Sequence, residues 1–197
     1  MGARILIVQG HPDIGRMHMC RALAHAYAEG ATAAGHEVEL VEPARLVFPL
    51  LSSAAEWRHG SPPPRLVAAQ ESMRRANHLV LLYPLWLGDM PAVLKGFLEQ
   101  VVRPGFALAP ARAGGRLFGD GLLRGRSARL VVSTTMAAPR YRWLHGAHSL
   151  KLMRRSILGP AGIAPMRSTV VGGAGRLSEA EIERWRERVR ALGRRAS

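Results

Sequence analysis

A polar loop near the start of the chain carries side chains that could bind a phosphate group. Residues 10–18 follow a short apolar run and precede an alanine-rich stretch, so they are expected to join a strand to the first turn of a helix. Free backbone N–H groups and the helix dipole attract anions at such a position. His11, Arg16 and His18 add side-chain donors, while an ordinary polar loop is the alternative interpretation. Neither a glycine-rich dinucleotide fingerprint nor a P-loop lysine motif is present, which disfavours a nucleoside triphosphate enzyme.

A second candidate segment is an apolar turn that contains a tryptophan. It consists of Pro84, Leu85, Trp86 and Leu87, directly after a buried apolar run. A rigid turn of this kind offers a platform for a flat aromatic ring. Backbone N–H groups that a turn leaves unpaired can bond the polar atoms of such a ring. The alternative interpretation is that Trp86 fills the core.

A third candidate segment follows another apolar run, which ends at Ser133. Its hydroxyl and amide groups could reach the same ligand from the other side. The residues are Thr134, Thr135, Met136 and Ala137.

Two further side chains could stabilise developing negative charge. Tyr141 and His145 stand four residues apart and would share one face if this stretch is helical. Phenol and imidazole can both donate to an anion, while packing at the surface or at an interface is the alternative for each. Cys20 has no obvious base nearby in the sequence and is expected to be a buried small residue, and the other histidines show no metal-ligand spacing.

The elements that must position these residues alternate between strands and helices. Short apolar runs predict strands at 4–9, 78–83, 128–133 and 166–171, and the alternation of Glu37-Val-Glu-Leu-Val predicts the second strand at 37–41. Helical spacing predicts helices at 17–34, 65–77, 90–102 and 141–158, and a capping box opens a last helix at Ser178. Two long Gly/Pro-rich excursions cover 43–64 and 103–126.

This alternation predicts an α/β fold of three layers with a five-stranded parallel sheet in the order 2-1-3-4-5. Residues 1–197 are expected to form one domain of this kind. The strand order reverses between the first and third strands, and a ligand would bind at that edge of the sheet.

The composition adds a charge that needs an explanation. The formal net charge is +14, but the arginines are scattered from Arg4 to Arg195 and do not form one block. We favour a compositional bias over a nucleic-acid surface, although a basic nucleic-acid-binding protein stays open as an alternative. No signal-peptide pattern is visible and the longest apolar stretch is too short to cross a bilayer, so we expect a cytoplasmic protein without membrane insertion.

Several motifs together resemble one known family. They are Gly10-His-Pro-Asp13, Tyr83-Pro-Leu-Trp86, Met90-Pro-Ala-Val-Leu-Lys-Gly96 and Arg103-Pro-Gly-Phe106. In these motifs the chain resembles the flavin-dependent NAD(P)H:quinone oxidoreductases of the flavodoxin-like superfamily over residues 4–171. The resemblance implies non-covalent FMN or FAD and a ping-pong reaction, in which NAD(P)H passes hydride to flavin N5 and a quinone or similar acceptor then takes it.

The resemblance also implies roles for individual residues. His11 and the amides around His18 would hold the flavin phosphate, the segment 84–87 the isoalloxazine ring, and the segment 134–137 its polar edge. Tyr141 and His145 would stabilise the charge of the reduced flavin. The chain departs from the family pattern at 14–19, where a longer loop is expected, and at Met136 and Ala137, where the family has two glycines.

Two expectations concern partners. A homodimer with the site at the interface would cover apolar residues of the two excursions, namely Phe48, Leu50, Leu51, Trp57, Phe106 and Phe118. The alternative to an enzyme is a non-catalytic flavodoxin-like regulatory subunit.

Overall fold

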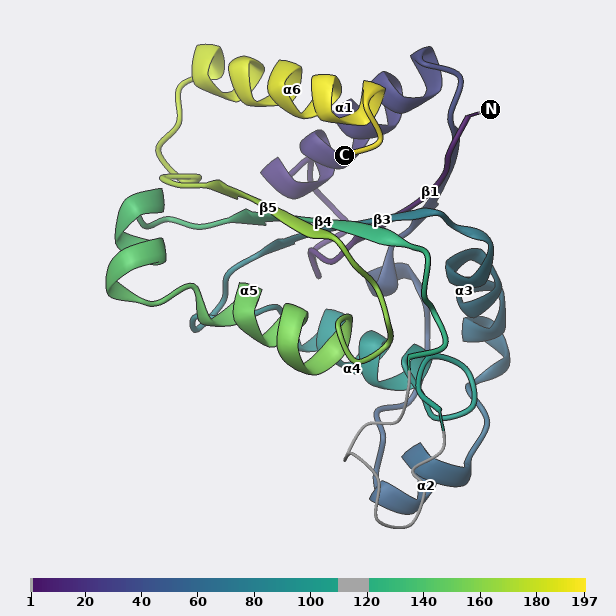
Figure 1. The fold of residues 1–197 in the computed structure, drawn as a ribbon. Helices are drawn as coiled ribbons and strands as arrows, with labels where there is room; N and C mark the ends of the chain where they lie inside the picture. The colour runs from purple at the N-terminus through teal and green to yellow at the C-terminus, as the bar shows by residue number, and fades with distance from the viewer. Residues whose placement is uncertain (1, 110–120) are drawn as a thin grey trace.

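Five parallel strands form the central sheet of the computed structural model, in the order β2-β1-β3-β4-β5 (Figure 1). The strands are β1 (Arg4–Gln9), β2 (Glu37–Val41), β3 (His78–Pro84), β4 (Ser127–Ser133) and β5 (Met166–Val171). The structure describes residues 2–109 and 121–197. The predicted strand order is confirmed, and each strand boundary agrees with the prediction to within one residue.

Helices cover both faces of this sheet, so the fold has the predicted three layers. Figure 1 shows α1 and α6 above the sheet and α3, α4 and α5 below it. The helices are α1 (Met19–Ala33), α2 (Ala54–His59), α3 (Pro64–Arg75), α4 (Ala92–Val101), α5 (His148–Leu152) and α6 (Glu179–Arg194). Shorter helical turns are η1 (Pro43–Arg45), η2 (Arg140–Leu144) and η3 (Met153–Ile157). None of the helices in the described part of the chain combines the length and apolar character that a bilayer crossing requires.

Alternating side chains of each strand enter two separate apolar cores. Ile5 and Ile7 of β1 pack under α1 and α6, whereas Leu6 and Val8 pack towards α4. Because both faces of the inner strands β1, β3 and β4 are buried, these strands read as mainly apolar runs in the sequence, whereas the edge strands β2 and β5 are partly exposed. The two cores hold the helix termini against the sheet and thereby place the loops that join them.

Three predicted helix boundaries differ from the structure by two residues: α4 begins at Ala92 and not at 90, α3 ends at Arg75 and not at 77, and the start of α1 differs as well. Helix α1 begins at Met19, two residues later than predicted, so the loop after β1 is longer. The excursion 43–64 contains α2, whose N-cap Ser53 accepts a hydrogen bond from Glu56 N. The Ser53-x-x-Glu56 pattern was the available signal for that helix.

The expected continuous helix at 141–158 is wrong. The chain forms η2, then a break in which Gly146 and Ala147 both have positive φ values of 58° and 48°, and only then α5 and η3. In η2 the His145 N–H donates to Arg140 O, a spacing of five residues. This stretch is therefore not the α-helix that the sequence predicted.

The buried histidine of β3 predicts an acid-sensitive fold. Burial, together with Arg129 and other nearby cations, lowers the pKa of His78 to about 4. Below the ordinary imidazole pKa of about 6.5, the unfolded chain takes up a proton that the folded chain excludes. The free energy of unfolding therefore decreases as the pH is lowered. We expect the free energy of unfolding to drop by about 2–3 kcal/mol between pH 6.5 and 4.5.

Urea titrations across this pH range measure that loss. His78→Gln is the matched variant, since it removes the titrating group from a site where His78 Nδ1 meets Ser127 Oγ at 2.7 Å. A loss of the same size in wild type and His78→Gln would contradict the assignment to His78.

Candidate functional site

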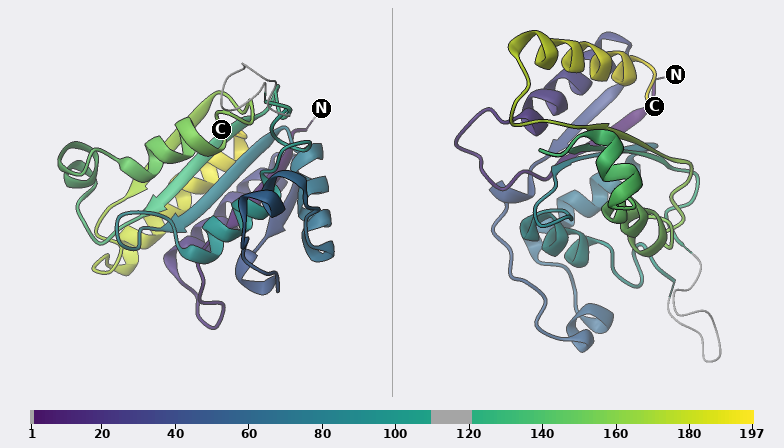
Figure 2. Two further views of the ribbon diagram at one scale, coloured as in Figure 1. Left: turned by 90° about the horizontal axis from the view of Figure 1, so that it is seen from below. Right: turned by 90° about the vertical axis from the view of Figure 1, so that its left-hand side faces the viewer.

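Three loops start at the carboxyl edge of the sheet, and each is tied to the neighbouring strand at its first residues. The loops cover 10–18 after β1, 85–91 after β3 and 134–138 after β4. The anchoring hydrogen bonds are Gly10 N to Leu82 O at 2.7 Å, Leu85 N to Ser133 O at 2.8 Å and Thr134 N to Val171 O at 2.9 Å. The right-hand view of Figure 2 faces this edge, where the three loops emerge from adjacent strands. They emerge where the strand order reverses, which is where parallel sheets bind ligands.

In the first loop, His11 and His18 stack on each other. Their ring centroids lie 3.9 Å apart, and His18 Nε2 lies 2.7 Å from Asp13 Oδ2. Burial lowers the pKa of His11, and the neighbouring His18 lowers it further, so the imidazole is neutral at pH 7. Its Nδ1 accepts the Asp13 N–H at 3.1 Å, which leaves the proton on Nε2. His11 therefore offers one neutral N–H donor at this edge.

The N-terminus of α1 has the properties of an anion site. Its N-cap His18 makes no side-chain cap hydrogen bond, and no acidic residue stands in the first turn. The first-turn N–H groups thus keep their donor capacity and the positive end of the helix dipole. These features fit a phosphate group.

A buried arginine that the sequence reading missed shapes this loop. Arg21 Nη1 donates to Ile14 O at 2.9 Å and to Arg16 O at 3.2 Å, while its Nη2 pairs with Glu42 at 2.9 Å. Arg16, predicted as a phosphate donor, is itself exposed. The signal for Arg21 was a charged residue within an otherwise apolar helix face.

The second loop is a tight turn that presents apolar side chains to solvent. Trp86 N donates to Asp89 O at 2.8 Å and Asp89 N to Trp86 O at 3.1 Å, with Leu87 and Gly88 in the left-handed region at φ 51° and 87°. Left-handed leucine is strained, and its side chain is fully exposed. Backbone strain of this kind is typical of functional turns.

The structure corrects one expectation for this turn. The N–H groups of Leu85 and Trp86 were expected to be unpaired, but both are used within the fold. Among the described residues, only the amides of Leu87 and Gly88 keep free donors in the turn. Trp86 is 50% exposed and meets His11 edge-on at 5.9 Å, so it does not fill the core. Pro84 is buried as the last residue of β3.

The third loop divides into buried and exposed residues. Thr134 is buried, and its Oγ1 accepts the Met136 N–H at 3.2 Å. Thr135 and Ala137 are exposed, and Met136 is half-buried. A Cβ on Gly172 would lie 2.4 Å from Ala138 N, so glycine is required where β5 ends against this loop.

Tyr141 and His145 differ in how far they are exposed to solvent. Tyr141 is 1% exposed with no hydrogen-bond partner for its hydroxyl, whereas His145 is exposed. Burial raises the pKa of Tyr141. The two side chains thus differ in exposure, and a joint role for the pair stays a prediction.

Beside Tyr141, a chain of hydrogen bonds ties α5 to the tryptophan turn. Ser149 Oγ donates to Asp89 Oδ1 at 2.6 Å and lies 3.1 Å from Tyr83 Oη. Asp89 Oδ1 also accepts the Met90 N–H at 2.8 Å. This network holds the turn in place, and its members were not singled out from the sequence.

Comparison with known proteins identifies the family. The profile described as "Flavodoxin-like fold" matches residues 3–192. The chain belongs to the flavodoxin-like fold family. NAD(P)H:quinone oxidoreductase from Methanothermobacter marburgensis superposes with a TM-score of 0.75 at 26% identity, covering 98% of this chain and 96% of that one. A quinone reductase structure from Klebsiella pneumoniae gives a TM-score of 0.79 at 21% identity over 97% of this chain and 83% of that one, and shows the fold alone.

Sequence relatives of this flavodoxin-like chain match over shorter lengths. Rat NAD(P)H dehydrogenase [quinone] 1 is 30% identical over 101 residues, which cover 51% of this chain and 35% of the rat protein. FMN-dependent NADH:quinone oxidoreductase of Acidobacterium capsulatum is 26% identical over 137 residues, which cover 63% of this chain and 64% of that protein. The matches thus span between about a third and two thirds of these relatives.

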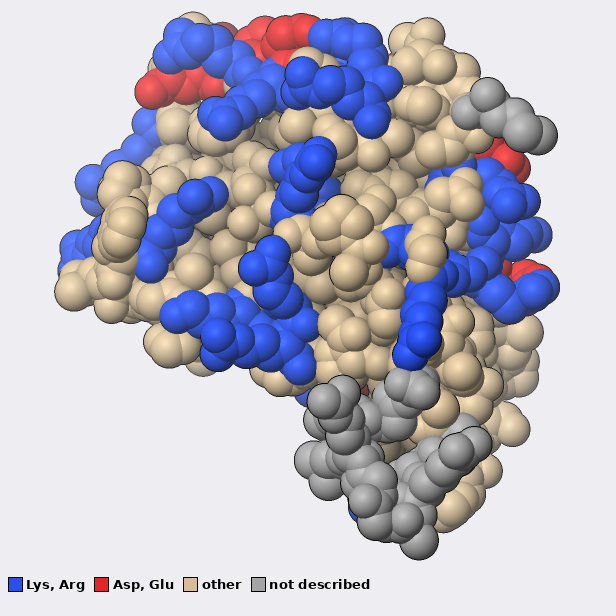
Figure 3. All heavy atoms as spheres, in the orientation of Figure 1, with Lys and Arg blue, Asp and Glu red and all other residues tan. Residues whose placement is uncertain are grey.

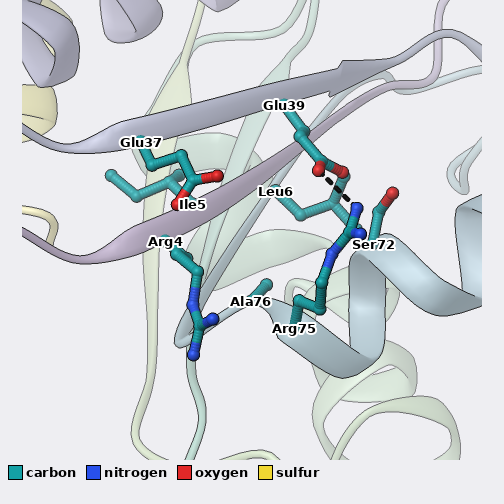
Figure 4. A pocket seen from close by; sticks show the side chains of 8 residues that line it. All are labelled: Arg4, Ile5, Leu6, Glu37, Glu39, Ser72, Arg75 and Ala76. Atoms are coloured by element: carbon teal, nitrogen blue, oxygen red, sulfur yellow. Dashed lines mark hydrogen bonds and ion pairs between the residues drawn. The ribbon is translucent and has the colours of Figure 1, made fainter.

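Other places in this flavodoxin-like protein fit a ligand less well. A small cavity of about 20 Å³ near the starts of β1 and β2 is bridged by Arg75 and Glu39 at 2.7 Å (Figure 4). Cys20 is buried beside Ser133, and burial raises its pKa to about 12, so it is no nucleophile. No group of three or more His, Cys, Asp or Glu side chains that could hold a metal occurs in residues 2–109 and 121–197.

Trp86 offers a direct test of the site. Because its side chain is half exposed, Trp86→Ala is expected to cost at most about 1 kcal/mol of apo stability, against about 3–5 kcal/mol for a buried tryptophan. Loss of a stacking surface should weaken flavin binding about tenfold. Thermal melts and a flavin fluorescence titration measure the two effects, with Trp57→Ala on α2 as the control that keeps flavin affinity. A large loss of apo stability in Trp86→Ala would contradict the assignment of Trp86 to the flavin site.

Proposed function

We propose that this protein is a flavin-dependent oxidoreductase that transfers electrons from NAD(P)H to a quinone or similar acceptor. The observation that carries the proposal is the position of the Trp86–Leu87 turn beside His11 and the uncapped start of α1. An apolar platform next to an anion site matches a flat ring with a phosphate tail. The names of the relatives from rat, Acidobacterium and Methanothermobacter support the same activity.

The residues of the chain then have distinct tasks. The first-turn amides of α1 and His11 Nε2 bind phosphate, while Trp86 and Leu87 exclude water from one ring face. The free amides of Leu87, Gly88 and Thr135 bond polar ring atoms. When bound, the flavin supplies two-electron chemistry in which NAD(P)H and the acceptor use the same face in turn.

A groove next to the phosphate loop bears on which flavin is bound. It has a volume of about 540 Å³, starts at His18 and continues past His25 to Ile182 and Arg186 of α6. FMN would end at the loop, whereas the adenosine of FAD would extend into this groove. The mass of the flavin released from purified protein separates the two.

Purified protein is expected to retain flavin and to oxidise NAD(P)H when a quinone is added. Visible absorbance and a stopped-flow assay without and with acceptor measure this. Retained flavin without turnover would favour the regulatory subunit, and failure to bind either flavin would overturn the proposal.

Tyr141 is the residue we propose to donate to the charged flavin, with His145 too exposed to assist it in the same way. Tyr141→Phe removes a hydroxyl that makes no hydrogen bond of regular geometry but has the N–H groups of Leu150 and Ser149 close by, so apo stability should change by no more than about 1 kcal/mol. The rate of flavin reduction by NAD(P)H should fall about tenfold. An unchanged rate would remove Tyr141 from the reaction.

We also propose a homodimer, in which the apolar residues available for the contact differ from those expected from the sequence. Three of the expected contact residues pack instead against their own core, namely Phe48, Trp57 and Phe106. Leu50 and Val47, three residues before it, stay 65% and 74% exposed, while Phe118 lies outside the described residues. Leu51 is half-buried.

Light scattering at micromolar concentration is expected to give twice the mass of the chain, and Leu50→Glu is expected to shift it towards the monomer. Arg58→Glu, an exposed change in α2, is the control that leaves the mass unchanged. A monomeric wild type that is fully active would contradict the dimer.

A further inference from the structure

One side of the molecule carries positive charge that is not neutralised. Residues 121–178 contain ten arginines and lysines and no aspartate or glutamate. Figure 3 shows blue side chains spread over the face that carries α5 and β5, with red confined to α6 and the far edge. We call the exposed cations of this segment the basic face; they are Arg140, Arg142, Lys151, Arg154, Arg155, Arg167 and Arg176.

The basic face differs from the other charged surfaces in its pairing. On α6, Arg186 pairs with Glu183 at 2.8 Å and Arg194 with Glu187 at 2.8 Å. Within the described residues, no cation of the basic face forms an ion pair, and Arg154 donates only to Met166 O at 2.7 Å. The face therefore presents several full charges to whatever lies opposite.

Two large apolar side chains stand within this charged surface. Trp143 and Leu144 of η2 are 86% and 73% exposed. They directly follow Arg140 and Arg142 and lead through three residues into α5 with Lys151. Adjacent exposed apolar residues of this size indicate a surface that is covered in use.

The charges decide which partner can cover this surface. A second copy would set like charges against each other in a two-fold contact, which is unfavourable. Nucleic acid would pair with the cations but gives an exposed leucine no apolar environment. An anionic bilayer satisfies both, because lipid phosphates attract Lys and Arg while Trp and Leu enter the interface between headgroups and acyl chains.

We propose that the basic face, with Trp143 and Leu144, binds the surface of an anionic lipid bilayer. A pocket of about 110 Å³ between α5 and β5 is lined by Lys151, Arg154, Arg167 and Ser168, and it receives a lipid phosphate. The turn η2, which carries Trp143 and Leu144, follows β4, and the Trp86–Leu87 turn follows the neighbouring β3. Both therefore lie at the carboxyl edge of the sheet (Figure 2). Together with the proposed function, this position places the site next to a membrane-dissolved quinone.

Vesicle sedimentation tests the binding. We expect the protein to bind vesicles of phosphatidylcholine with one third phosphatidylglycerol at low salt, to bind pure phosphatidylcholine at least tenfold less, and to release at high salt. Arg142→Glu with Arg155→Glu should lower the partition coefficient at least about tenfold. Arg58→Glu with Arg65→Glu changes the charge equally on exposed residues outside the basic face and should lower it much less.

Tryptophan fluorescence of the unmodified chain supplies a second measurement that needs no charge-reversed variant. Binding should shift the emission to shorter wavelength, and Trp143→Phe should abolish most of that shift. Equal binding to both vesicle types, no binding at low salt, or an undiminished shift in Trp143→Phe would each overturn the proposal. So would preferential binding of a DNA duplex through the same residues.

The result is independent of the enzyme activity. Vesicle binding without quinone turnover would leave the membrane surface standing and remove the proposed function. Turnover with a water-soluble quinone but no vesicle binding would support the proposed function and remove the membrane surface.

Discussion

The structure depends on three backbone hydrogen bonds that extend the parallel ladder just beyond its strands. Gly10, Leu85 and Thr134 each donate to the neighbouring strand or its last residue, so the three loops begin at fixed places. Parallel pairing requires helical crossovers, which place every loop of this kind at one edge. The candidate site is therefore a consequence of strand order, and only its chemistry is left to the individual side chains.

Most of the fold could be predicted because its signals are local and mutually consistent. The inner strands β1, β3 and β4 are buried on both faces, so each appears as a mainly apolar run, and the capping box at Ser178 opens α6 as expected. The break at Gly146–Ala147 could not be foreseen. Alanine carries no signal for a left-handed backbone; here Tyr141 and Ser149 on either side are both buried, and the Ala147 N–H donates to Tyr141 O at 3.2 Å.

The candidate site was only partly predictable, because the residue types are visible in the sequence but their pairing is not. The motif around Trp86 indicated a ring platform, yet it could not show that the amides of Leu85 and Trp86 are used within the fold. Arg21 and the Asp89–Ser149 contact depend on segments far apart in the chain. The charge of the chain likewise reads as scattered in sequence, while folding gathers an acid-free segment on one side.

Hydrogen–deuterium exchange of the apo-protein with and without added FMN tests the central claim most directly. The account predicts slower exchange in three separate peptides at once, covering the first turn of α1, the turn 85–91 and the loop 134–138. Peptides from α2 and α3 serve as the internal reference and should not change. Protection confined to one of the three loops, or located elsewhere on the molecule, would contradict a flavin site at this edge of the sheet.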